Sequence, residues 1–170
     1  CPLEFWSPWR LENDPNGQAQ QFGLGEVGSQ LIDLLNPSRL LDILRNFAIF
    51  TSDKKKRRIK IICRYQQYEG ANKIIERVQE GRLKKGLIWH FQGSGKSLLM
   101  VFAAQKLRKA PELKSPTVII LVDRIDLDTQ ITGTFSAADV ANVVTTDSIS
   151  ELHELLEKGT RKVIITTIYK

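Results

Sequence analysis

From about residue 60 onward, short unbroken apolar runs alternate with segments in which apolar residues recur at helical spacing. The apolar runs predict strands at residues 59–63, 86–90, 117–122, 142–145 and 162–166. The helical patterns cover residues 69–79, 97–109, 125–131 and 149–158. Strands without polar alternation are buried on both faces, which is typical of a parallel sheet between layers of helices. Residues 60–170 are therefore predicted to form a three-layer α/β domain.

Residues 1–59 have a different pattern. They open with an aromatic cluster made of Phe5, Trp6 and Trp9. A polar stretch rich in Gly and Gln follows and is typical of a loop. Two helical patterns come next, at residues 31–35 and 40–48, and Ser38 is the expected N-cap of the second. This region is predicted to be a helical connector whose aromatic residues pack rather than bind a ligand.

The composition adds a basic excess to this picture. The chain has 170 residues and a formal net charge of +6, which favours a polyanionic partner such as nucleic acid. The basic run at residues 54–58 is nevertheless interpreted as a solvated loop. No apolar run is long enough to cross a membrane, and two cysteines without a ligand pattern fit a reducing cytoplasm. Because the chain starts at Cys1 and ends in a predicted strand, we expect it to be a piece of a longer polypeptide.

A glycine-rich segment, Gly93-Ser94-Gly95-Lys96-Ser97, lies between a predicted strand and a predicted helix. Glycines let the backbone approach a phosphate, and the following helix N-terminus favours an anion. In such a P-loop, the lysine contacts the β- and γ-phosphates of ATP and the last hydroxyl completes the shell of Mg²⁺. His90 departs from the common pattern, which has a small residue there. The alternative is an ordinary glycine turn, which the flanking strand and helix disfavour.

Residues 64–68, at the start of the helix before this loop, resemble the Arg-x-x-Gln element of superfamily 2 helicases. In that family the glutamine recognises adenine. Gln67, three residues after Arg64, matches its position, and Gln66 remains an alternative. A carboxamide both donates and accepts hydrogen bonds, so it would select ATP over GTP. Considered alone, the same residues also fit a polar helix start.

Two further segments resemble elements of the same superfamily that contact nucleic acid. Residues 122–130 resemble motif Ia, in which Arg124 would contact phosphate without reading the base sequence. Residues 163–170 resemble a Thr-Thr-Ile-x-Lys element, in which the hydroxyls of Thr166 and Thr167 would bond DNA phosphate. Without the resemblance, a capped turn and ordinary β-propensity would explain both segments.

Together these segments resemble the motor of the R (restriction) subunit of type I restriction–modification enzymes, in which a histidine such as His90 is usual. The resemblance implies that residues 60–170 are a P-loop (RecA-like) motor domain, incomplete at its C-terminus. It implies that residues 1–59 connect this domain to a preceding nuclease. It also implies ATP and Mg²⁺ as cofactors, double-stranded DNA and the modification and specificity subunits as partners, and a bacterial or archaeal cytoplasm.

The resemblance further implies that the whole protein hydrolyses ATP to pump double-stranded DNA and cleaves it away from the recognition site. The acidic residues that would hold Mg²⁺ are expected just past Lys170. The arginine finger is expected to come from a second motor domain. We therefore expect this chain by itself to bind ATP with little or no hydrolysis, because phosphoryl transfer depends on those groups. The alternatives are another superfamily 2 helicase or translocase, a small-molecule kinase, and a non-catalytic P-loop module.

Overall fold

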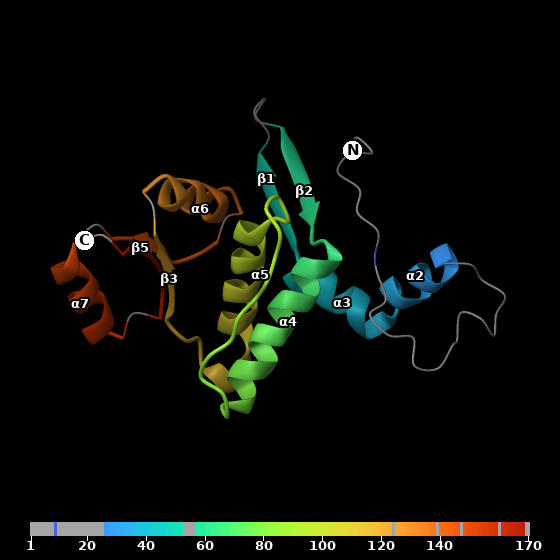
Figure 1. Cartoon of the computed structure of the whole chain (residues 1–170), viewed down its shortest axis with the longest axis horizontal. Helices are drawn as coiled ribbons and strands as arrows, with labels where there is room; N and C mark the ends of the chain where they lie inside the picture. Colours follow the sequence, from blue (N-terminus) through green and yellow to red (C-terminus); the bar gives the residue numbers. More distant parts are fainter. Residues whose placement is uncertain are drawn as a thin grey trace.

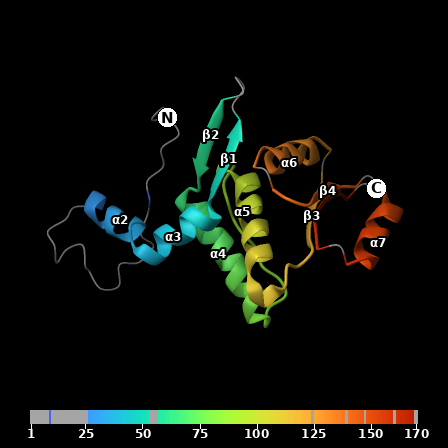
Figure 2. The same cartoon turned by 180° about the vertical axis from the view of Figure 1, so that it is seen from behind.

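The computed structural model describes Trp9 and residues 26–52, 57–123, 125–138, 140–146, 148–159 and 161–168. Its elements form three groups in space (Figure 1): helices α2 and α3 with the β1–β2 hairpin, the pair α4 and α5, and a sheet flanked by α6 and α7. Helix α5 lies in the middle of the molecule in this view and in the view from behind (Figure 2). Among the described residues no helix is long and apolar enough to span a membrane.

The two helices predicted in the connector are present as α2 (Glu26–Leu34) and α3 (Pro37–Asn46). The predicted N-cap of α3 is wrong by two residues. Asn36 is the N-cap, and its side-chain oxygen accepts hydrogen bonds from the backbone N–H groups of Ser38 and Arg39. The reason is Pro37, which suits the first helical position because it has no N–H to satisfy. The cap must therefore precede it.

A β-hairpin follows α3 and was not predicted as such. Strand β1 (Ala48–Ser52) pairs antiparallel with β2 (Arg58–Ile62) in a register that joins Ala48 to Ile62. The helical spacing in the sequence continues through Ala48, whereas α3 ends at Asn46 and Phe47 is its C-cap. The region before residue 60 thus contains β-structure as well as the two predicted helices.

Helix α4 (Tyr65–Glu80) packs against α5 (Lys96–Lys109). The two helices approach closely at Gly70, where a Cβ atom would lie 2.7 Å from Leu99 Cδ1. The buried rings of Phe47 and Phe102, with centroids 5.5 Å apart, join α5 to the end of α3. The connector and the α/β region therefore share one apolar core.

A parallel three-stranded sheet has the order β3–β5–β4, formed by Val118–Val122, Val163–Thr167 and Val143–Thr145. All three predicted strands lie within one residue of these bounds at both ends. Helix α6 (Ile125–Ala137) is six residues longer than predicted, and α7 (Ile149–Glu157) precedes β5. A short 3-10 helix, η2 (Pro111–Leu113), links α5 to β3. The fold is thus a mixed α/β arrangement with a small parallel sheet.

The prediction that this sheet is covered on both faces is only partly right. One face, which includes Ile120 and Val122 of β3, is buried in the core with α5 and α6. On the other face Ile119 and Leu121 are 48% and 58% exposed. Strand β5 is buried along its whole length and is the central strand of the sheet. Continuous apolar sequence therefore predicted the environment of β5 correctly and that of β3 only on one side.

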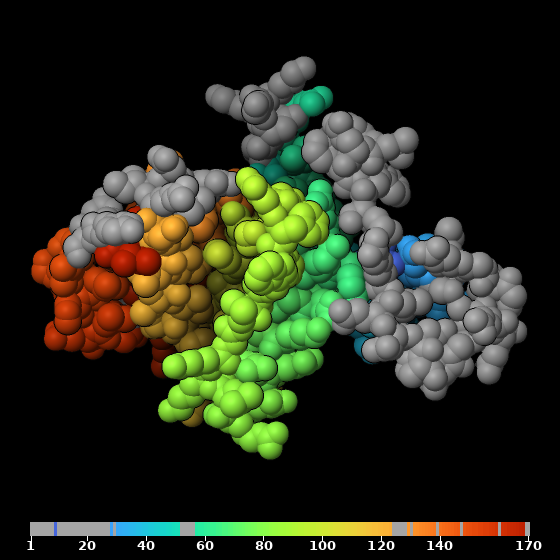
Figure 3. All heavy atoms as spheres, viewed as in Figure 1, coloured from blue at the N-terminus to red at the C-terminus, as the bar shows by residue number. Residues whose placement is uncertain are grey.

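The predicted buried strand at residues 86–90 is wrong in this structure. Residues 83–91 form neither helix nor strand, and Leu87 and Trp89 are 88% and 89% exposed. Figure 3 shows this yellow-green segment on the surface of the molecule. It runs beside α4, where Arg77 Nη1 donates to the backbone oxygen of Lys85 over 2.9 Å. An apolar run forms a strand only where another strand edge is available for pairing, and this segment lies against a helix.

Candidate nucleotide-binding site

The glycine loop connects the exposed segment to α5. Gly93 and Gly95 both have φ of 81°, a left-handed conformation that favours glycine, and α5 begins at Lys96. A Cβ atom at Gly93 would have no heavy atom within 4 Å, so the loop is open at this point. The backbone N–H groups of the first turn of a helix have no partner within that helix. The loop and the start of α5 therefore form a local arrangement suited to an anion.

The Lys96 side chain turns back over this loop. Its ammonium group donates to the backbone oxygens of His90 and Phe91 at 2.9 and 3.2 Å, and the side chain is exposed to solvent. The backbone oxygens are neutral acceptors, whereas a phosphate oxygen carries charge and forms a stronger, charge-assisted bond with an ammonium group. Lys96 is therefore positioned over the loop by contacts that an anionic ligand would outcompete.

The two serines of the loop differ in burial. Ser94 is 2% exposed, and its buried hydroxyl oxygen has no hydrogen-bond partner among the described residues. Ser97 is half-buried in the first turn of α5. A hydroxyl is an acceptable ligand for Mg²⁺, and Ser97 is the residue predicted for that role. The part of the chain that the structure describes contains no cluster of three or more His, Cys, Asp or Glu placed to hold a metal.

Gln67 is the best-connected polar side chain of this region. It is 2% exposed, and its Oε1 accepts from the backbone N–H of Arg64 at 2.8 Å. Its Nε2 donates to the backbone oxygens of Ser94 and Gly95 at 3.4 and 3.1 Å. The structure thus brings Gln67 together with the glycine loop, 27 and 28 residues away in the sequence. The neighbouring Gln66 is only half-buried.

The residues predicted to contact DNA are placed as follows. Arg124 lies outside the described residues, immediately before α6. Thr166 and Thr167 are 4% and 5% exposed at the end of β5. The Thr166 hydroxyl donates to the backbone oxygen of Thr146 at 3.2 Å, and the Thr167 hydroxyl oxygen has no partner in the described part of the chain. A phosphate contact by either threonine would require its hydroxyl to become accessible, so this role stays a prediction.

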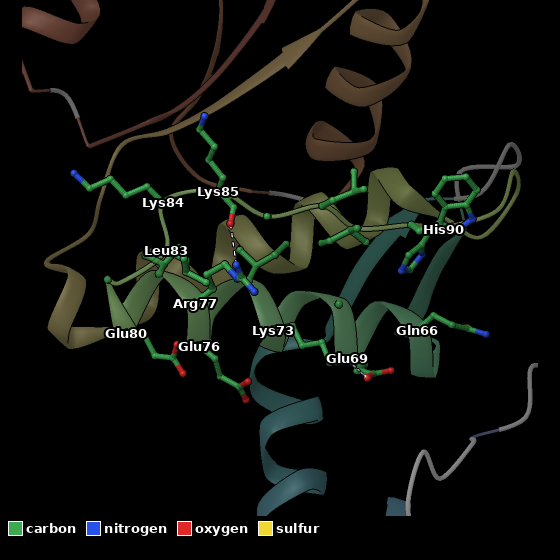
Figure 4. A pocket seen from close by; sticks show the side chains of 18 of the residues that line it. Gln66, Glu69, Lys73, Glu76, Arg77, Glu80, Leu83, Lys84, Lys85 and His90 are labelled. Atoms are coloured by element: carbon green, nitrogen blue, oxygen red, sulfur yellow. Dashed lines mark hydrogen bonds and ion pairs between the residues drawn. The ribbon is translucent and has the colours of Figure 1, made fainter.

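A groove of about 1230 Å³ lies beside this site rather than in it. Figure 4 shows it between α4 and residues 83–91, with Arg77 reaching across to Lys85. Its lining extends to His90 and Phe91 but includes none of residues 93–97. The groove is therefore not the predicted phosphate site.

Sequence reasoning missed a polar network that ties the connector to the helices flanking the loop. Lys106 of α5 donates to both carboxylate oxygens of Asp42 at 2.8 and 2.7 Å and to Asn72 Oδ1 at 2.6 Å. Asn46 Nδ2 also donates to Asp42, at 2.7 Å. These residues lie 4 to 64 positions apart, so no local motif signals the network.

Burial and charge in this network shift two pKa values. Burial alone would raise the pKa of Asp42, but hydrogen bonds from Lys106 and Asn46 together with the positive charge of Lys106 hold it below its usual value. Burial, followed by the negative charge of Asp42, raises the pKa of the Tyr68 hydroxyl. Cys63 is a buried core residue, and burial raises the pKa of its thiol to about 12.

Comparison with known proteins agrees with the geometry of this region. The SWI2/SNF2 ATPase family matches residues 66–170, from the start of α4 to the end of the chain. The type I restriction enzyme HindI endonuclease subunit of Haemophilus influenzae is 39% identical over 79% of this chain and 13% of its own length. The putative type I restriction enzyme MjaVIIP endonuclease subunit of Methanocaldococcus jannaschii is 35% identical over 95% of this chain and 16% of its own length.

A third relative, the type I restriction enzyme SsaAORF53P endonuclease subunit of Staphylococcus saprophyticus, is 30% identical over 80% of this chain and 14% of its own length. The chain thus spans only a small part of the relatives that it matches. The predicted resemblance to type I restriction subunits is confirmed by these similarities. The chain belongs to the SWI2/SNF2 ATPase family and is related to the endonuclease subunits of type I restriction enzymes.

Proposed function

We propose that residues 93–97 bind the phosphates of ATP and that the chain is the nucleotide-binding part of a DNA-translocating motor. The observation that carries the proposal is the junction at Gly95–Lys96, where a left-handed glycine leads directly into α5. This junction places helix N–H groups and a lysine ammonium group at one point, which is the combination that binds phosphate in P-loop proteins.

Each loop residue has a distinct part in this proposal. Gly93 leaves open space at the loop for the phosphates, and Lys96 exchanges the backbone oxygens of His90 and Phe91 for phosphate oxygens. Ser97 supplies a hydroxyl ligand to Mg²⁺, which would neutralise charge on the phosphates. The buried hydroxyl of Ser94 has no hydrogen-bond partner in the described structure. This fits a loop that changes its contacts when a ligand binds.

For the whole protein, the names of the relatives support a wider proposal. They are endonuclease subunits of type I restriction enzymes, and the family match covers the region that contains the glycine loop. The protein would hydrolyse ATP, pump double-stranded DNA and cleave it away from a recognition site, together with modification and specificity subunits in a bacterial or archaeal cytoplasm. Arg124, Thr166 and Thr167 would contact the DNA backbone, which carries no base identity.

The test is ATP hydrolysis by the full-length protein with and without double-stranded DNA, beside its Lys96→Ala variant. The proposal predicts turnover that DNA stimulates and that the variant loses. Turnover that is indifferent to DNA would leave an ATPase but remove the translocase. Unchanged turnover in Lys96→Ala would remove the assignment of the phosphate site. Cleavage of the DNA in the same reaction would separate a restriction subunit from another superfamily 2 translocase.

A further inference from the structure

The basic excess of the chain is concentrated in the segment that forms the β1–β2 hairpin. Residues 48–62 contain six basic residues and a single acidic one, so they carry +5 of the formal net charge of +6. The rest of the chain is almost neutral. Positive charge gathered on one element attracts a polyanion to that element, whereas charge spread evenly over a surface does not. The hairpin is therefore where the basic character of the chain can act.

The register of the hairpin separates an inward face from an outward face. Neighbouring side chains of a strand point to opposite faces, and Phe50 is paired directly with Lys60. On the inward face Ile49 is buried and lines a depression together with Leu98 of α5. On the outward face Phe50 is 48% exposed, and Arg58 and Lys60 are exposed as well. One face thus packs on the core, and the other presents two cations and an aromatic ring to solvent.

The aromatic ring of this outward face orients one of the two cations. The guanidinium carbon of Arg58 lies 4.4 Å from the centroid of the Phe50 ring. Such a cation–π contact restricts a long side chain while its charge stays at the surface. It also occupies the ring, which is then not free to stack on an unpaired base as in proteins that bind single strands. The face therefore offers oriented positive charge, which suits a phosphate backbone.

We propose that the outward face of the β1–β2 hairpin, formed by Phe50, Arg58 and Lys60, binds the phosphate backbone of double-stranded DNA. Each exposed cation can neutralise one phosphate, and such contacts carry no base identity. Strands β1 and β2 extend past the start of α5 in both views of the molecule (Figure 1 and Figure 2). The inference rests on the proposed function for the choice of DNA as the polyanion. It adds a contact outside the segments at residues 122–130 and 163–170.

The salt dependence of DNA binding tests this face directly. Affinity for duplex DNA of arbitrary sequence is measured by fluorescence anisotropy over a range of salt concentrations, without nucleotide, on the full-length protein. The test variant combines Arg58→Gln with Lys60→Gln. Losing two phosphate contacts predicts roughly tenfold weaker binding at physiological salt and a slope of log affinity against log salt that is smaller by about two. The control combines Lys84→Gln with Lys85→Gln, two exposed lysines outside the hairpin, and should keep the wild-type affinity and slope.

An unchanged slope in the Arg58 and Lys60 variant, or an equal change in the control, would overturn the inference. Arg58→Lys combined with Lys60→Arg keeps both charges, so it should keep the wild-type slope, and a loss of slope in this variant would contradict binding through charge. A wild-type protein that binds no duplex would refute the proposed translocase and the inference with it. A wild-type protein that binds DNA through this face without DNA-stimulated ATP hydrolysis would refute the motor alone.

Discussion

Strand β5 and the segment at residues 86–90 contain similar apolar residues but lie in opposite environments. Val163, Ile164 and Ile165 are fully buried, whereas Leu87 and Trp89 are almost fully exposed. The difference is in backbone pairing, because β5 is hydrogen-bonded to a strand on each side and residues 86–90 lie beside α4. Apolar side chains thus require cover, but the neighbouring backbone decides whether a segment becomes a strand.

The largest effect is expected from shortening one apolar side chain in each of these two segments. Ile165→Ala should lower the free energy of unfolding by about 3–4 kcal/mol, because it leaves a cavity in the core. Leu87→Ala should change it by less than about 0.5 kcal/mol, because Leu87 is already in solvent. Urea unfolding of both variants measures the contrast. A Leu87→Ala loss close to that of Ile165→Ala would mean that residues 86–90 form a buried strand in solution.

A smaller loss is expected at the polar network that joins α3 to α5. Lys106→Met removes the partner of a half-buried carboxylate and should cost roughly 2 kcal/mol. Lys84→Met, on the exposed segment beside α4, is the matched control and should be nearly neutral. Urea unfolding at neutral pH measures both. Equal free energies of unfolding for the two variants would show that the network does not hold the connector in place.

The same network gives a pH dependence. The folded pKa of Asp42 is lowered, so its contribution to stability is fully present above the unfolded value, about 3.9. It is lost as the pH falls through the lower folded value. The wild-type protein should therefore have a higher free energy of unfolding than Asp42→Asn at neutral pH, and this difference should disappear on acidification below pH of about 4. A difference in the free energy of unfolding that stayed constant to lower pH would contradict a stabilising role for the ionised Asp42 carboxylate.

The smallest effect concerns the reactivity of Cys63. With a pKa of about 12 and 7% exposure, its thiol should react very slowly with a thiol reagent at pH 8. Labelling in a Cys1→Ser background, followed by mass spectrometry, isolates this residue. Rapid labelling would place Cys63 outside the core, whereas labelling that appears only with urea would place it inside.

Local patterns predicted much of the fold. The helices α3, α5 and α7 and the strands β3, β4 and β5 were all expected near their observed bounds, whereas α2 begins five residues before the pattern that predicted it. Strand β1 was missed because helical spacing around Phe47 continued the pattern of α3, whereas β2 lies within one residue of the strand predicted at residues 59–63. The glycine loop was expected from five consecutive residues. The contact of Gln67 with Ser94 could not be expected, because it joins side chain to backbone across 27 residues and depends on how α4 packs on α5.

The most direct measurement is equilibrium binding of MgATP to the protein and to its Lys96→Ala variant, with Lys84→Ala as the control. Binding does not require the groups expected outside this chain, so it tests the phosphate site itself. The predicted result is a loss of roughly ten- to hundredfold in affinity for Lys96→Ala and none for Lys84→Ala, because only Lys96 faces the glycine loop. Equal affinity of Lys96→Ala and the wild type would contradict the account.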